Sequence, residues 1–165
     1  MSPSARRKVL VLALGNADRG DDGIGALVAA KLVDRLPPDV TLLARAGDML
    51  SLIEDWAGFD AAVCVDAAAP QHAAGRICRI DLASDELPHA PSAASSHAFG
   101  FAEAIALART LGRAPRDIIV YAIEGLEFEP GAPLTYDVAA AADDAADQII
   151  AEVQALRAPA RTTGC

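Results

Sequence analysis

The chain has 165 residues, of which 53% are hydrophobic and 4% aromatic, and a formal net charge of −9. This length predicts one domain over residues 1–165, with an ordered core over about 8–157 and a frayed C-terminal tail. The acidic charge argues against nucleic acid or an anionic membrane surface as partners, because their phosphates would be repelled, and the apolar runs are too short to span a bilayer.

The first part of the chain alternates strands and helices. A continuous apolar run predicts a buried parallel strand over Val9–Leu14, and an apolar stripe at helical spacing predicts a helix over Gly23–Leu36. A shorter strand is expected over Val40–Ala44. The next helix is predicted over Asp48–Ala57, with its first residue as the N-cap.

The middle of the chain departs from this alternation. A strand over Ala61–Val65 delivers Asp66 at its C-terminal end, and the next strand, over Arg76–Leu82, follows without a crossover helix. That connection predicts an antiparallel strand at the edge of the sheet, because parallel neighbours need a crossover. The segment Ser84–Ser96 is a loop rich in Pro, Ser and Ala, and loops of this length are more often functional than idle.

Two helices flank the last predicted strand. Apolar spacing predicts a helix over His97–Leu111, with Ala108 and Leu111 among its inward residues. A central strand is expected over Ile118–Ile123. A long helix from about Thr135 to Leu156 completes the predicted domain.

Several familiar signatures are missing from the sequence. The glycines Gly15, Gly20, Gly23 and Gly25 do not form G-x-G-x-x-G, and no P-loop, G-x-S-x-G or H-E-x-x-H sequence occurs. Nucleotide binding is therefore poorly supported, and we expect no organic cofactor. The three widely spaced cysteines form no disulfide framework, which favours a cytoplasmic protein.

Three candidate metal ligands are expected at one rim of the sheet. Asp22 opens the first helix, Asp66 follows the third strand, and His97 opens the helix after the long loop. Two carboxylates and an imidazole suit a borderline divalent cation such as Ni²⁺ or Zn²⁺. A helix N-terminus disfavours positive charge, so His97 is favoured in its neutral, metal-binding form.

Each of these residues also has a simpler interpretation. Asp22, or its neighbour Asp21, can be a helix N-cap, Asp66 can cap a turn, and His97 can be structural or solvated. The metal hypothesis therefore depends on the convergence of all three side chains at one edge.

Other side chains are weaker candidates. Cys64 lies two residues before Asp66 and can be considered as a nucleophile, although a packed core cysteine is the simpler interpretation. His72 and His89 lie in polar loops and are expected to be exposed to solvent, although His89 can approach the site. Asp18 and Arg19 either are solvated turn residues or line the cleft. Glu124, Glu127 and Glu129 in the last loop either face a basic partner or are solvated.

Together these motifs resemble the hydrogenase maturation protease family. The segment G-N-A-D-R-G-D-D-G-I-G is similar to the opening signature of that family, V-D-A at 65–67 to its second motif, and S-H-A-F-G at 96–100 to its third. The loop E-G-L-E-F-E-P-G and the following L-T-Y-D-V extend the resemblance from Val9 to about Leu156. It implies a three-layer α/β/α sandwich with a five-stranded, mostly parallel mixed sheet of the phosphorylase/hydrolase type.

The resemblance also implies a function. It implies a nickel-dependent endopeptidase that removes the C-terminal extension of a nickel-iron hydrogenase large-subunit precursor, with nickel carried by the precursor and bound by Asp22, Asp66 and His97. One of the two carboxylates, Asp22 or Asp66, is the expected general base. We expect a monomer. Two alternatives stay open: a non-catalytic nickel-binding hydrogenase assembly factor with the same ligands, and a small-molecule hydrolase with its own metal ion.

Overall fold

A computed structural model describes residues 5–46, 48–82 and 96–158, with the backbone alone for 49 and 96–102. The predicted loop over Ser84–Ser96 and the predicted tail after Arg157 lie almost wholly outside the described residues. In the described part, no helix is long and apolar enough to cross a membrane. The elements, with η1 a 3₁₀ helix, are β1 (Val9–Leu14), η1 (Gly20–Gly23), α1 (Ile24–Leu32), β2 (Thr41–Arg45), α2 (Met49–Asp55), β3 (Ala61–Ala68), β4 (Ile77–Asp81), α3 (Ser96–Thr110), β5 (Asp117–Glu124), α4 (Tyr136–Ala140) and α5 (Ala142–Arg157).

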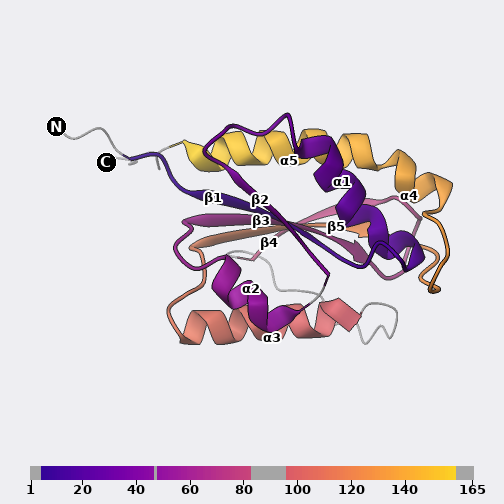
Figure 1. Ribbon diagram of the computed structural model, residues 1–165, viewed down its shortest axis with the longest axis horizontal. Helices are drawn as coiled ribbons and strands as arrows, with labels where there is room; N and C mark the ends of the chain where they lie inside the picture. The colour runs from indigo at the N-terminus through magenta and orange to yellow at the C-terminus, as the bar shows by residue number, and fades with distance from the viewer. Residues whose placement is uncertain (1–4, 47, 83–95, 159–165) are drawn as a thin grey trace.

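The five-stranded mixed sheet confirms the predicted topology. Its strand order is β2-β1-β3-β5-β4; the first four strands are parallel, and β4 pairs with β5 antiparallel at the edge. All six residues of β1 are buried, as expected for a strand covered on both faces. In the edge strand β4, Cys78 and Arg79 are exposed and Ile80 is buried. Helices on both faces complete the α/β/α sandwich (Figure 1).

The residues of β1 alternate between two cores, one on each face of the sheet. Odd-numbered residues such as Val11 pack in the same cluster as Ile149 of α5. Even-numbered residues such as Leu12 pack in the cluster that contains Trp56 and Ile105 of α3. Figure 1 shows α1, α4 and α5 over one face and α2 and α3 over the other. Both layers are therefore anchored on the same central strand.

The first helix is shorter than predicted. The expected helix over Gly23–Leu36 is preceded by the turn of η1 and ends at Leu32. The amides of Arg35 and Leu36 both donate to the carbonyl oxygen of Leu32, at 3.0 and 3.2 Å, which closes the helix in a turn before Pro37. The apolar stripe alone does not reveal this early end, because Leu36 packs against the core from the turn.

The predicted helix over Thr135–Leu156 is divided into α4 and α5 by a turn at Ala141. Asp143 and Asp144 lie in the first turn of α5, where the positive end of the helix dipole stabilises acidic side chains. The second helix therefore has its own favourable start. Ala145, Ile149 and Val153 of α5 are fully buried, and Leu156 is partly buried.

The structure confirms α3 to within one residue of each predicted end of His97–Leu111. Ala108 is buried, but the inward position predicted for Leu111 is wrong, since its side chain is 55% exposed. Leu111 follows the last helical residue, and Gly112, with a φ of 67°, turns the chain away immediately afterwards.

The close approach of α1 to β1 at Gly25 provides a test of this packing. A Cβ atom at Gly25 would lie 2.4 Å from the carbonyl oxygen of Leu14, far inside contact distance. We expect Gly25→Ala to destabilise the protein by about 1–3 kcal/mol, because the helix and the strand must separate. Intrinsic helix propensity alone predicts that Gly25→Ala stabilises the protein, by about 1 kcal/mol. Urea unfolding distinguishes the two, and a more stable variant would contradict this packing.

Candidate functional site

The candidate site lies at the carboxyl ends of the parallel strands β1, β3 and β5. This carboxyl edge of the sheet is distinct from its edge strand β4. In open α/β sheets, ligands bind outside these carboxyl ends. The loop from β1 through η1, the segment after β3 and the β5–α4 loop all begin here. Figure 1 shows the N-terminal end of α3 at the same edge. The topology thus brings together the segments that carry the predicted site residues.

Asp22 stabilises the loop that precedes it. The residue lies in η1 and is 4% exposed, and its Oδ2 accepts a hydrogen bond from the amide of Asn16 at 2.8 Å. Gly15, with a φ of 129°, permits this approach, because a Cβ there would lie 2.1 Å from the carbonyl oxygen of Asp22. The helix-cap interpretation is wrong, since the N-cap of α1 is Gly23 and no side chain caps it.

Asp66 lies within β3, and not after it as predicted. The strand was expected to end at Val65, but its ladder with β5 continues to the pair Ala68↔Glu124. An acidic residue is tolerated in this strand because its side chain is only half-buried, near the end of the ladder.

The side chain of Asp66 makes a local hydrogen bond. Its Oδ1 accepts from the amide of Ala67 at 2.8 Å, within the strand. The 3₁₀ helix η1 contacts β3, so the segments that carry Asp22 and Asp66 adjoin each other. Two of the three predicted ligands therefore come from neighbouring elements at one edge.

His97 is the second residue of α3, which begins one residue before the predicted helix start at His97. Its side chain, and the whole of His89, lie outside the described part of the structure. Among the described side chains, no group of three or more His, Cys, Asp or Glu residues is arranged to hold a metal ion. The site of Asp22, Asp66 and His97 therefore stays a prediction.

Asp21 has a structural role that the sequence did not reveal. Its carboxylate is fully buried and accepts hydrogen bonds from the amides of Leu126, Glu127 and Thr135 at 2.8, 2.9 and 2.7 Å. The hydroxyl of Thr135 also lies 3.0 and 2.9 Å from the two carboxylate oxygens. Asp21 thereby fixes the β5–α4 loop against η1.

These hydrogen bonds keep Asp21 ionised. Burial by itself would raise the pKa of Asp21, but the amides of Glu127, Thr135 and Leu126 and the Thr135 hydroxyl together lower it below its ordinary value. A buried carboxylate is tolerated here because it is surrounded by hydrogen-bond donors.

Glu124 plays the same part for the loop after β3. The residue ends β5, is 6% exposed, and accepts short hydrogen bonds from the amides of Gln71 and His72. Burial opposes its ionisation, yet the hydrogen bonds from this loop lower the pKa of Glu124. Of the two interpretations considered for this residue, contact with a basic partner and full solvation, neither is correct.

Cys64 is a core residue. It is fully buried, and burial, with a smaller contribution from the charge of Asp66, raises the pKa of the Cys64 thiol above its ordinary value. The thiolate is the nucleophilic form of cysteine, so this environment suppresses its reactivity. The structure favours the simpler interpretation of Cys64.

Comparison with known proteins identifies a single family. A family model described as HycI, hydrogenase maturation protease, matches residues 28–152. The hydrogenase expression/formation protein HupD of Bradyrhizobium diazoefficiens is 31% identical over 157 residues, which cover 90% of this chain and 81% of HupD. The hydrogenase 2 maturation protease of Escherichia coli is 27% identical over 150 residues, 89% of this chain and 91% of that protein. The solved structure of the hydrogenase maturating endopeptidase HybD from E. coli matches with a TM-score of 0.77 and 27% identity, over 90% of this chain and 93% of HybD.

The role of Asp21 predicts a pH-dependent loss of stability. The pKa of Asp21 in the folded protein is below its ordinary value of 3.8. The ionised carboxylate therefore stabilises the fold above the ordinary pKa, and this stabilisation is lost as the pH falls through the lower pKa of the folded state. We expect Asp21→Asn to lower the free energy of unfolding at neutral pH by about 1.5–3 kcal/mol. Urea unfolding at about pH 7 and about pH 3 should show a smaller difference at the lower pH. A difference that is equal at both pH values would contradict the assignment, and Asp34→Asn, at an exposed position, is the control.

The two described cysteines should differ in reactivity. Cys78 is exposed and Cys64 is buried. We expect iodoacetamide to alkylate Cys78 in the native protein and to leave Cys64 intact, since alkylation requires an accessible thiolate. Peptide mass spectrometry after digestion measures both sites, and urea should make both reactive. Alkylation of native Cys64 would restore it as a candidate nucleophile.

Proposed function

The chain belongs to the hydrogenase maturation protease family, and we propose that it is a nickel-dependent endopeptidase that removes the C-terminal extension of a nickel-iron hydrogenase large-subunit precursor. Membership makes the protein a hydrolase that acts on peptide bonds in hydrogenase maturation. The dependence on nickel, the ligands and the position of the cut are the proposed steps beyond the family.

The observation that carries the proposal is the meeting of three segments at one edge. The helix η1, which bears Asp22, contacts the strand β3, which bears Asp66. Helix α3, with His97 in its first turn, begins at the same edge (Figure 1). Two carboxylates and a neutral imidazole match the ligand preferences of Ni²⁺. The family match extends over Asp66 and His97 and begins after Asp22.

In this proposal nickel is part of the substrate. A precursor that already carries nickel would present the ion to Asp22, Asp66 and His97, and this contact would hold the scissile peptide at the carboxyl edge of the sheet. The ion would polarise the peptide carbonyl or a water molecule. One of the two carboxylates would accept the proton of the attacking water, a role that requires hydrogen-bond reach to that water.

A metal carried by the substrate also supplies a checkpoint. A precursor without nickel would make fewer contacts with the three ligands, so cleavage would wait until the metal is installed. Binding energy at the ion would then be used to position the peptide, as expected when remote contacts orient a reacting bond.

The proposal includes a place of action and an assembly state. We place the protein in the cytoplasm as a monomer that meets one precursor at a time. The support is the cysteine usage, since the described cysteines, Cys64 and Cys78, are both free thiols. The net charge of −9 supports a protein client over nucleic acid.

The proposal predicts loss of processing when a ligand is removed. We expect the wild type to shorten a nickel-loaded precursor and to leave a nickel-free precursor intact. Asp22→Asn, Asp66→Asn and His97→Ala should each slow processing by at least about 100-fold, because even changes around the ligands of a metal cost about 10- to 100-fold. Gel mobility and intact mass of the precursor measure the cut.

The matched control is Asp34→Asn, which removes one exposed carboxylate from the turn after α1, at the opposite edge. It should process the precursor at the wild-type rate. Retained processing in Asp66→Asn or His97→Ala would remove that residue from the site. Stable binding of the loaded precursor without any cleavage by the wild type would instead favour an assembly factor.

A further inference from the structure

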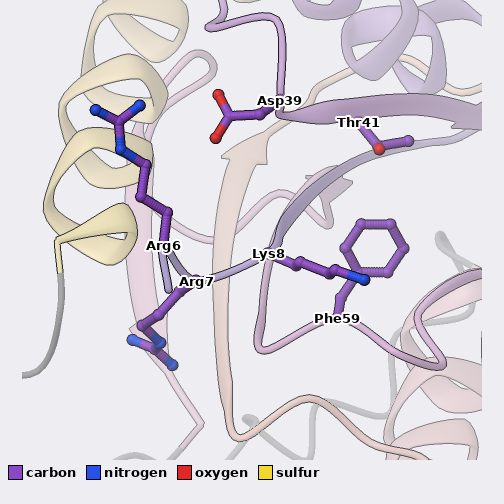
Figure 2. Close-up of a pocket in the computed structure, with 6 residues that line it drawn as sticks. All are labelled: Arg6, Arg7, Lys8, Asp39, Thr41 and Phe59. Atoms are coloured by element: carbon purple, nitrogen blue, oxygen red, sulfur yellow. The ribbon is translucent and has the colours of Figure 1, made fainter. Parts of the chain in front are cut away.

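A hollow lies at the amino ends of the parallel strands, opposite the candidate site. Its volume is about 400 Å³, and it is lined by Arg6, Arg7, Lys8, Asp39, Thr41 and Phe59 (Figure 2). The basic residues precede β1, Asp39 precedes β2, Thr41 begins β2, and Phe59 precedes β3. The candidate catalytic residues are at the other end of these strands, so this hollow is not part of that site.

The floor of the hollow is held in place by hydrogen bonds. The amide of Lys8 donates to Oδ2 of Asp60 at 2.7 Å, and the amides of Asp60 and Ala61 donate back to the carbonyl oxygen of Lys8 at 2.9 and 3.2 Å. Arg7 forms an ion pair with Asp117 and donates to the carbonyl oxygen of Asp60 at 3.3 Å. A ligand therefore meets a preformed surface, which reduces the entropic cost of binding.

The charges that line the hollow are not balanced. Arg7 is neutralised by Asp117, and Asp39 is neutralised by Arg157 at 2.7 Å. Among the described residues, the exposed side chains of Arg6 and Lys8 form no hydrogen bond or salt bridge, although the charge of Arg6 also acts on Asp39. Two positive charges are thus available here, in a chain whose net charge is −9.

The aromatic ring of Phe59 provides an apolar surface in the same hollow. Phe59 is half-buried, and Figure 2 shows Lys8 extending to the side of the hollow where Phe59 and Thr41 lie, with Arg6 on the other side. A segment that carries carboxylates could pair with Lys8 and Arg6 while one of its apolar side chains packs on the ring of Phe59. The Thr41 hydroxyl is an additional donor.

From this arrangement we propose that the hollow docks an acidic segment of a partner protein that carries apolar side chains between its carboxylates. Most of the lining residues are exposed, whereas sites for small molecules enclose their ligands. Most of the surface of this acidic protein repels an acidic partner. The partner would therefore approach in the orientation that brings its acidic segment to the hollow.

The test uses the intact protein and a fluorescein-labelled peptide built from Glu, Leu and Gly. We expect fluorescence anisotropy to show saturable binding at low salt that weakens as the salt concentration rises. Arg6→Gln and Lys8→Gln should each weaken binding about two- to fivefold, as expected for single exposed ion pairs, and the double variant by about tenfold or more. A peptide with Gln in place of Glu should bind weakly to every variant.

The control variant is Arg76→Gln, which removes one exposed positive charge from the opposite edge, directly before β4. Its affinity for the acidic peptide should equal that of the wild type. The proposal fails if the wild type does not bind the peptide, if the double variant keeps its affinity, or if Arg76→Gln loses as much as Lys8→Gln. Competition by inorganic phosphate at equal ionic strength would show a small-anion site and overturn the protein partner.

Discussion

The buried carboxylate of Asp21 is the interaction on which the candidate site depends. It joins η1 to the β5–α4 loop, across sequence separations of 105 to 114 positions. Main-chain hydrogen bonds run beside it, from the amide of Asp21 to Glu127 at 2.7 Å and from the amide of Gly20 to Ala132 at 3.0 Å. Because a charged group in this position must keep its donors, the two loops are held in one relative position. The next residue, Asp22, takes its place at the edge from this arrangement.

The acidic residues around the carboxyl edge have two different roles. Asp21 and Glu124 are enclosed by main-chain amides and fix the loops around the edge. Asp22 accepts a hydrogen bond from the nearby amide of Asn16, and Asp66 accepts one from the amide of Ala67. A carboxylate whose oxygens already accept several amide hydrogens is a poor metal ligand or base. The adjacent pair Asp21 and Asp22 therefore combines one structural and one proposed catalytic side chain.

The parts of this structure that could be predicted are those determined by local patterns. The continuous apolar runs of β1 and β5 and the 3.6-residue apolar stripe of α5 specify their elements locally, and the missing crossover before β4 specified its antiparallel direction. The roles of Asp21 and Glu124 could not be predicted, because their partners are more than 50 positions away. Asp66 was placed beyond its strand for a related reason: the end of β3 is set by its pairing with β5, which no local pattern in β3 records.

The two ends of the sheet have opposite chemical character, and their separation matters for function. The carboxyl edge carries the acidic residues suited to a cation, and the start of β1 carries Arg6 and Lys8. The six residues of β1 between them span about 20 Å at about 3.3 Å per residue. Unit charges that far apart interact by less than about 1 kcal/mol at an effective dielectric constant of about 20, and salt weakens the interaction further. An acidic segment bound at the amino edge would therefore not weaken the attraction of Asp22 and Asp66 for a cation, so partner binding and peptide cleavage can operate on one small domain without electrostatic conflict.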